Sequence, residues 1–250
     1  DPNPTAQPAP APTGRIDMHS HMLPGIDDGC TTVAESLESI RALIDHGYVG
    51  TVCTPHCWPT LYPANTPAHI ALWVEALRTE IDKAGLDYTL WTGGELRLYP
   101  DVIPWMQAQG VPTLAVSRYL LCDFWENKWP KWADAAFDWL LAHDYTPILA
   151  HPERSAAPKD YDTRLDRSVE KGVILQGNFQ CFTGEAGYRA DQLVRQYMDE
   201  GRYTLFALDM HRPDALPGRL DGIAVASEEY GAARIDAMTD DVVRDLLWPS

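Results

Sequence analysis

The stretch IDMHSHMLPGIDDG near the amino terminus contains several side chains that could bind a metal ion. His19 and His21 stand two residues apart at the end of a short apolar run, and Asp27 and Asp28 follow. Imidazole nitrogens and carboxylate oxygens are ligands that Zn, Mn and Fe accept. Each piece alone also occurs in surface turns or hydrogen-bonded pairs, so the rest of the chain decides whether a metal site exists.

The other candidate ligands also follow short apolar runs. They are His56 after GTVCTP, Glu95 after YTLWTGG, His151 after TPILA, and Asp209 with His211 after YTLFAL. Buried charged groups require partners, so this repetition favours one shared site over separate structural roles. With one aspartate of the Asp-Asp pair, the set holds about eight ligands, more than one ion needs. Two or three ions fit better, and close metal pairs suit the hydrolysis of phosphate esters.

The apolar runs alternate with helical patterns along the chain. Strands are predicted at 15–19, 50–56, 88–95, 118–124, 146–154, 172–178 and 203–211. Helices are predicted at 33–44, where Thr32 and Glu35 form a capping box, and at 70–81, 134–143, 191–201, 221–230 and 239–247. About seven consecutive βα units predict a parallel barrel, in which the carboxyl ends of all strands meet on one face and form the active site.

Composition narrows the class of protein. The chain of 250 residues has a net charge of −16, which argues against nucleic acid as a partner. No stretch is apolar over the length of a membrane-spanning helix, so membrane insertion is not expected. Five cysteines without a CxxC pair indicate reduced thiols and predict a cytoplasmic location. Residues 1–14 are Pro/Ala-rich and predicted to be a flexible tail, and residues 15–250 are predicted to form one domain.

Six segments together resemble the PHP superfamily, which is named for polymerase and histidinol phosphatase domains. They are DMHSHMLPGIDDG, TPH at 54–56, GGELRLYPD at 93–101, VPTLAVSRYLLCDF at 111–124, PILAHPERS at 147–155 and FALDMHRPD at 206–214. The match is closest to the manganese-dependent protein-tyrosine phosphatases of bacterial capsule and exopolysaccharide loci. The resemblance implies an α/β fold, a distorted (β/α)₇ TIM-like barrel of the PHP type.

The resemblance also implies a ligand set and its ions. Mn²⁺ is implied, as two or three ions, and Fe or Zn would accept the same ligands. The matching residues of this chain are His19, His21, Asp28, His56, Glu95, His151, Asp209 and His211. Asp28 matches better than Asp27 because it directly precedes the glycine.

Arginines near the motifs complete the implied site. Arg154, in the HPER segment, matches an arginine that binds the substrate phosphate in the family. A second family arginine follows the last motif, and either Arg212 or Arg219 could fill that role. We expect the catalytic roles to fall to Arg154, Asp209 and His211.

The activity implied by the resemblance is hydrolysis of phosphotyrosine in proteins, by attack of a hydroxide that bridges two metal ions. A bacterial tyrosine kinase is the implied phosphoprotein partner. The alternative is a PHP phosphatase, phosphodiesterase or phosphotriesterase that acts on small phosphate esters such as histidinol phosphate. Amidohydrolases also begin with His-x-His, but they typically carry a bridging lysine, and no lysine ends a predicted strand here. The complete ligand set and Arg154 disfavour a metal-stabilised binding module without catalysis.

Cysteine-dependent phosphatase chemistry can be tested on the sequence. It needs His-Cys and an arginine after five further residues, but His56-Cys57 is followed by WPTLYPA. Cys57 is therefore predicted to be a packed thiol rather than a nucleophile. Trp58, Trp125 and Trp129 either line an aromatic mouth of the site or pack at its rim.

Overall fold

The computed structural model describes residues 13–126, 128–155 and 161–248. Most of the predicted tail at 1–14 lies outside the described residues, and the first strand begins at Arg15. All strands pair in parallel. Within the described chain they are β1 (Arg15–Ser20), β2 (Tyr48–Cys53), β3 (His56–Cys57), β4 (Thr89–Thr92), β5 (Glu95–Arg97), β6 (Tyr119–Asp123), β7 (Thr146–Ala150), β8 (Ile174–Asn178) and β9 (Leu205–Ala207).

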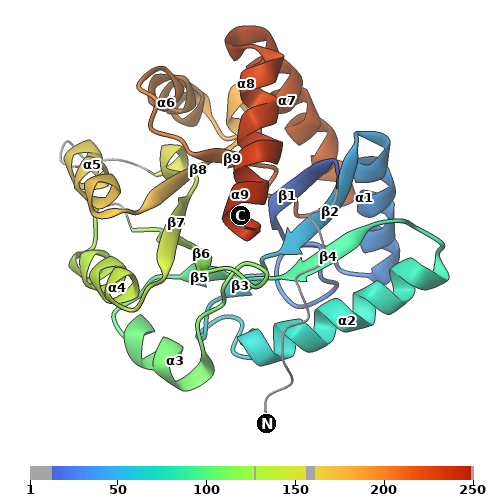
Figure 1. The fold of residues 1–250 in the computed structure, drawn as a ribbon, viewed down its shortest axis with the longest axis horizontal. Coiled ribbons are helices and arrows are strands. Elements are labelled where there is room, and N and C mark those ends of the chain that lie inside the picture. The colour runs from blue at the N-terminus through green and yellow to red at the C-terminus, as the bar shows by residue number, and fades with distance from the viewer. Residues whose placement is uncertain (1–12, 127, 156–160, 249–250) are drawn as a thin grey trace.

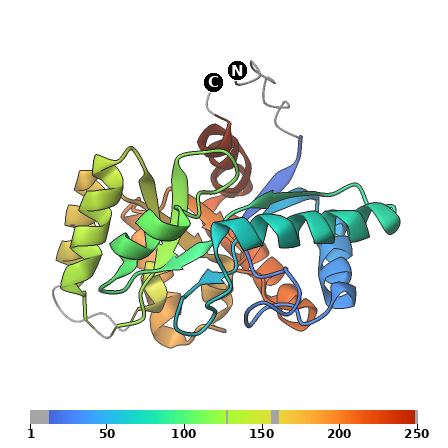
Figure 2. The ribbon, with the colours of Figure 1, turned by 90° about the horizontal axis from the view of Figure 1, so that it is seen from below.

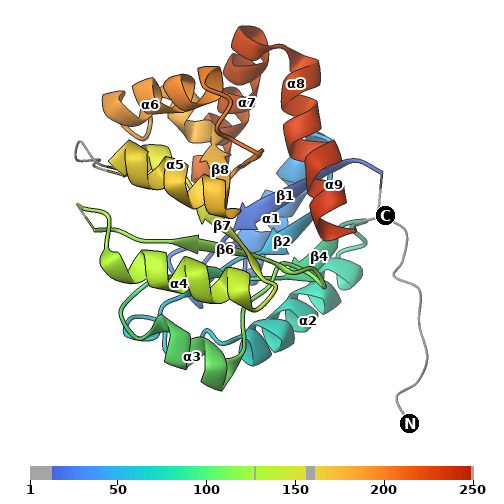
Figure 3. The same cartoon turned by 60° about the vertical axis from the view of Figure 1, so that its left-hand side comes forward.

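Helices surround these strands (Figure 1). In the part of the chain that the structure describes they are α1 (Val33–Asp45), α2 (Pro67–Lys83), α3 (Val102–Gln109), α4 (Lys131–Ala142), α5 (Tyr161–Lys171), α6 (Tyr188–Asp199), α7 (Leu216–Tyr230), α8 (Ala232–Asp236) and α9 (Val242–Leu247). Figure 3 shows α3, α4, α5 and α6 stacked one after another along one side. This arrangement confirms the α/β part of the predicted fold class, with parallel strands. None of the described helices has the length and apolar character needed to cross a bilayer.

The strands form two parallel sheets, in the order β1-β2-β4 and β3-β5-β6-β7-β8-β9. Two of the seven predicted strands are broken, which raises the number of separate strands. Residues 50–56 divide into β2 and β3 at Thr54 and Pro55, because proline lacks the N–H that a central strand donates. Residues 88–95 divide into β4 and β5 at Gly93 and Gly94. At Gly94 a Cβ atom would lie 2.6 Å from the Sγ of Cys57. This contact is too close, so the position favours glycine.

Two apolar cores stabilise the sheets. The larger one packs the strands against the helices and includes the face of α2 predicted from helical spacing, Ile70, Val74, Leu77 and Ile81. The smaller core joins residues of β1, β2, β6, β7 and β9 with Val243, Leu246 and Leu247 of α9. In Figure 1 this short helix lies near the centre of the view, beside strands of both sheets. The last helix therefore covers an interior of the sheets that would otherwise be exposed.

The one predicted helix cap, that of α1, is confirmed, whereas α2, α4, α6 and α7 begin before their predicted ranges. The Thr32 hydroxyl accepts a hydrogen bond from the Glu35 amide at 3.2 Å, as the capping box predicts. Val33, predicted on the apolar face, is exposed, whereas Ile40 is fully buried. The helices α3 and α5 were not predicted, because α3 is short and α5 is highly polar. The predicted helix at 239–247 begins with a π-turn over Ala237–Asp241 before α9.

Two predicted strands end earlier than expected, and both end at candidate metal ligands. Strand β7 ends at Ala150, since His151 has a φ of 36° and starts the 3₁₀ turn Pro152–Arg154. Strand β9 ends at Ala207, and Asp209 has a φ of 51°. Such left-handed backbone is uncommon for residues other than glycine and concentrates at functional sites. In Figure 2 the loop after β1 lies at the opposite end of the molecule from α9. The turns at His151 and Asp209 occur at the same end as this loop.

Candidate metal centre

The candidate ligands come together at the carboxyl ends of the strands, as the barrel prediction requires. Strand pairing places His56 of β3 directly beside Glu95 of β5. His19 lies on β1, His151 follows β7, and the remaining ligands lie in the loops after β1 and β9. All eight predicted ligands fall into groups whose nitrogen and oxygen atoms lie within 4.8 Å of one another.

Glu95 lies at the middle of the cluster and is almost fully buried. Its Oε2 is 2.9 Å from Nδ1 of His56 and 3.5 Å from Nε2 of both His19 and His21. Its Oε1 is 3.0 Å from Nε2 of His151. One carboxylate thus contacts four imidazoles from three different segments of the chain.

Asp209 forms a second point of convergence. Its Oδ1 lies 3.2 Å from Nε2 of His19 and 3.5 Å from Nε2 of His21 and Nδ1 of His211. The Nε2 atoms of His19 and His21 are themselves 3.2 Å apart. Ring nitrogens and carboxylate oxygens that point at one small space are the donor set expected for bound divalent ions.

Asp28 and His211 close the outer side of the cluster. The Asp28 side chain is 48% exposed, and its Oδ1 lies 3.4 Å from Nε2 of His56 and 3.5 Å from Nε2 of His211. The four groups with metal-binding spacing share members, since His19, His21, Glu95 and His151 each belong to two of them. Overlapping groups of this kind fit a site for more than one ion better than they fit a site for a single ion.

The sequence prediction missed Asp123. This carboxylate ends β6, is buried, and forms a group with Glu95 and His151. Burial and the charge of Glu95 raise the pKa of Asp123 to about 6. The signal was available, since Asp123 follows the apolar run YLLC in the same way that the other ligands follow theirs.

Charge balance explains how these groups are tolerated in the interior. Burial alone would raise the pKa of Glu95, but the rings of His19 and His56 hold that pKa well below its usual range. Burial opposes the charged ring of His56, yet Glu95 and Asp28 raise its pKa to about 12. Asp27 likewise outweighs burial and raises the pKa of His21 to about 10. Without metal, protons on His21 and His56 offset the charge of the carboxylates.

A second set of polar residues orients the histidine rings, a role that the sequence did not predict for them. Asp27 Oδ2 lies 2.8 Å from Nδ1 of His21 and accepts a 3.0 Å hydrogen bond from the His56 amide. Asp27 therefore orients a histidine, whereas Asp28 is the aspartate that joins the metal-binding groups. Because partners on one ring nitrogen turn the other nitrogen inward, Asp27 fixes the geometry of the ligand.

A similar chain of contacts supports His19. Gln176 Oε1 lies 2.9 Å from Nδ1 of His19, and the Gln176 amide donates to Asn178 Oδ1 at 2.7 Å. Asn178 in turn donates to Asp209 Oδ2 at 2.8 Å. The segment QGN of β8 thus supports both His19 and Asp209 from the side facing β8.

The three predicted arginines lie in different surroundings. Arg154 donates from Nη1 to Asp209 Oδ2 at 2.8 Å, and its side chain is 41% exposed. Arg219 is buried and donates from Nε to the carbonyl oxygen of Asp209 at 2.9 Å. Arg212 is mostly exposed and lies 3.9 Å from Asp214, beside a surface hollow lined by acidic residues of α1.

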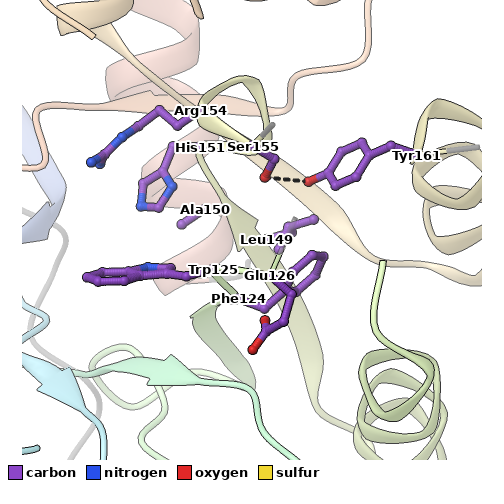
Figure 4. Close-up of a pocket in the computed structure, with 9 residues that line it drawn as sticks. All are labelled: Phe124, Trp125, Glu126, Leu149, Ala150, His151, Arg154, Ser155 and Tyr161. Atoms are coloured by element: carbon purple, nitrogen blue, oxygen red, sulfur yellow. Dashed lines mark hydrogen bonds between the residues drawn. The ribbon is translucent and has the colours of Figure 1, made fainter. Parts of the chain in front are cut away.

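A cavity of about 280 Å³ adjoins the cluster. Figure 4 shows Arg154 and His151 on one side of this space and the indole of Trp125 across from them. Cys57 is fully buried, and burial raises the pKa of its thiol. These properties agree with the prediction that Cys57 is not a nucleophile.

The comparisons with known proteins decide the family. A family model described as capsular polysaccharide synthesis, CpsB/CapC, matches residues 15–245. The chain belongs to the CpsB/CapC family. The predicted resemblance to tyrosine phosphatases of capsule loci is therefore confirmed.

Relatives within the CpsB/CapC family carry phosphatase names. The tyrosine-protein phosphatase YwqE of Bacillus subtilis is 28% identical over 196 residues, which is 78% of this chain and 77% of the relative. The tyrosine-protein phosphatase CpsB of Streptococcus agalactiae is 25% identical over 241 residues, which is 93% of this chain and 98% of the relative.

Solved structures support the same family assignment. One chain from the crystal structures of YwqE and of CpsB from Streptococcus pneumoniae, described as unique metal-dependent tyrosine phosphatases, superposes with a TM-score of 0.83. It is 26% identical, and the match covers 93% of this chain and 94% of that one. A phosphotriesterase homology protein from Escherichia coli shares the fold, with a TM-score of 0.58 and 12% identity.

The raised pKa values of His21 and His56 predict how stability depends on pH without metal. Between the usual histidine pKa of about 6.5 and pH 10, the folded state holds protons that the unfolded chain has lost. Metal-free protein should therefore lose about 1 to 4 kcal/mol of unfolding free energy from pH 7 to 8.5, as measured by urea denaturation. Metal-loaded protein should show the opposite trend, because metal displaces those protons.

A matched pair of variants controls this measurement. His56→Gln should reduce the pH dependence of the metal-free protein, whereas His143→Gln, at the end of α4 and away from the cluster, should leave it unchanged. A metal-free protein whose stability is constant or rises over this range would show that the imidazoles are not protonated in the cluster.

Proposed function

We propose that this chain is a metal-dependent protein-tyrosine phosphatase that hydrolyses phosphotyrosine in proteins. The observation that carries the proposal is the convergence of the eight predicted ligands and Arg154 beside one cavity at the strand ends. The names of the CpsB/CapC relatives support the same activity. A bacterial tyrosine kinase is the proposed phosphoprotein partner, and the cytoplasm is the proposed location.

The donor set fits divalent ions, and we assign two or three Mn²⁺. The residues that would hold them are those of the overlapping groups, His19, His21, Asp28, His56, Glu95, His151, Asp209 and His211, with Asp123 as an additional candidate. Bound ions of this kind lower the pKa of water and stabilise charge on phosphoryl oxygens. The same ligand types accept Fe or Zn, so availability contributes to the choice of metal.

Arg154 binds the phosphate in this proposal. Its contact with Asp209 places the guanidinium at the border between the ligand cluster and the cavity. A planar guanidinium can donate two parallel hydrogen bonds to phosphate oxygens, which a lysine cannot copy. Arg219 holds the backbone of Asp209 instead, and the exposed Arg212 is the remaining candidate for a second phosphate contact.

Asp209 and His211 complete the proposed catalytic group. Burial and the nearby His21 lower the pKa of His211 to about 4, so its ring is neutral at pH 7 and can act as a ligand or accept a proton. Asp209 receives hydrogen bonds from both Arg154 and Asn178, which fix its carboxylate. The tyrosyl leaving group has a pKa of about 10, so it departs without a strong acid.

The fold proposed for this activity is a distorted (β/α)₇ barrel. The pairs β2–β3 and β4–β5 each continue one segment of the chain, which leaves seven βα units. Ser20 forms an isolated parallel bridge to Met210, and β1 contacts β9. These contacts bring the first and last strands together beside the ligand cluster.

Metal dependence and substrate choice test the function together. Protein stripped with a chelator should release no phosphate, and added Mn²⁺ should restore turnover of a phosphotyrosine peptide over a phosphoserine peptide and a phosphotriester. Cys57→Ser should keep most of this activity, which separates the mechanism from cysteine chemistry. Restored activity that favours the phosphotriester or phosphoserine would contradict the assigned substrate.

Replacing Arg154 tests its role in binding phosphate. Arg154→Lys should lower kcat/KM for the phosphotyrosine peptide by about 100-fold, because the paired donors are lost. Metal content, measured by mass spectrometry, should not change. Arg118→Lys, at the amino end of β6, serves as a control and should have full activity. A loss of metal in Arg154→Lys would instead assign Arg154 a structural role.

A further inference from the structure

Trp125 is a large apolar side chain that remains 57% exposed beside the candidate site. It lines the cavity across from Arg154 (Figure 4). Its ring centroid lies 6.0 Å from that of His56, in an edge-to-face arrangement. Trp129, the nearby tryptophan, is instead buried and packs against Phe124 and Tyr161. Only one of these two neighbours therefore presents a ring to the cavity.

The exposed indole is held from several sides. Its N–H donates a hydrogen bond to Asp123, and the Trp58 ring contacts it edge-to-face at 5.1 Å between centroids. The guanidinium carbon of Arg97 lies 5.4 Å from the centroid of Trp125 and 5.1 Å from that of Trp58. A cation at this distance from two ring centroids attracts both.

Arg97 is itself fixed by the fold. It ends β5, two residues after Glu95, and is only 8% exposed. Its Nη2 donates to Glu126 Oε1 at 2.9 Å, and Glu126 also lines the cavity. Among the described residues its Nη1 has no hydrogen-bond partner, so stacking on the two rings is a principal contact of this buried cation.

The result is a preformed aromatic surface that faces the phosphate-binding side of the cavity. A ring held in place before binding loses little freedom when a second ring packs on it. Aromatic rings attract one another at centroid distances of about 4.5 to 7 Å. The cavity of about 280 Å³ separates this surface from Arg154, so a ring joined to the phosphate by one oxygen can enter it.

We propose that Trp125 is a specificity-determining residue that packs against the aromatic ring of the substrate, and that Arg97 is the positioning residue that holds Trp125 there. The proposal rests on the proposed phosphatase function and names the part of its substrate that the cavity recognises. An alkyl phosphate such as phosphoserine offers no ring to this surface. Trp125 would therefore select aryl phosphate esters.

Binding of two phosphonates separates the ring from the phosphate. Benzylphosphonate and methylphosphonate carry the same anionic group, cannot be hydrolysed, and differ by one aromatic ring. In calorimetric titrations of Mn²⁺-loaded protein, benzylphosphonate should bind roughly tenfold more tightly than methylphosphonate. Trp125→Ala should remove this preference and leave methylphosphonate affinity and metal content unchanged, and Trp125→Phe should keep most of it.

Tyr188→Ala is the matched control, because Tyr188 is an exposed aromatic residue of α6 that does not line the cavity. It should leave both affinities unchanged. Equal affinity of the two phosphonates for the unmodified protein would overturn the proposal. An equal loss of both affinities in Trp125→Ala would also overturn it, since that result indicates a general structural role.

The positioning role of Arg97 has its own test. Arg97→Met should weaken benzylphosphonate about as much as Trp125→Ala does, and the double variant should show no further loss. Glu126→Gln provides a milder variant that weakens the hold on Arg97 and keeps every ring. Unchanged benzylphosphonate affinity in both variants would exclude a positioning role for Arg97.

These titrations also distinguish the two proposals. A benzylphosphonate preference in a protein that fails to hydrolyse phosphotyrosine would support the aromatic surface and reject the assigned substrate. Hydrolysis of phosphotyrosine without that preference would reject the aromatic surface alone.

Discussion

The structure depends on the burial of Glu95 among four imidazoles. An isolated carboxylate at this depth would be strongly destabilising, so its partners must be present and well placed. These partners come from three separate segments of the chain, and each of His19, His21, His56 and His151 contacts Glu95. Strands that all run in the same direction deliver these side chains to one point, because their carboxyl ends meet on one face. The strand order and the loop conformations must therefore bring the imidazole partners of Glu95 to this one carboxylate.

The local backbone reflects the same requirement. His151 and Asp209 adopt left-handed conformations that shorten β7 and β9, and both point into the cluster. Breaks at Pro55 and Gly94 let His56 and Glu95 form their own short strand pair beyond β2 and β4. At the other end, α9 fills the space between strands with apolar side chains. The fold thus separates an apolar end, which supplies stability, from a polar end, which supplies chemistry.

Much of this arrangement could be predicted from the sequence. The rule that polar residues following apolar runs meet on one face predicted that the eight candidate ligands lie together, as they do in the structure, because parallel strands impose it regardless of side-chain detail. The same rule also applies to Asp123, which was missed because the predicted strand 118–124 places it inside the strand rather than at its end. The strand breaks follow from Pro55 and from the Gly93-Gly94 pair, whose effect depends on contacts across the sheet.

Other features depend on tertiary geometry that no local pattern encodes. Asp27 and Asp28 are adjacent, and only the turn of the loop directs one to His21 and the other to the outer side of the cluster. Arg212 and Arg219 could not be separated, since the path of α7 decides which of them contacts Asp209. The sequence also could not decide which tryptophan lines the mouth of the cavity, because Trp125 and Trp129 differ in burial but not in residue type.

Diffraction from crystals of Mn²⁺-loaded protein, recorded at the manganese absorption edge, tests the central claim most directly. The account predicts two or three anomalous peaks among His19, His21, His56, Glu95, His151 and Asp209. A single peak, or peaks only outside this cluster, would contradict it.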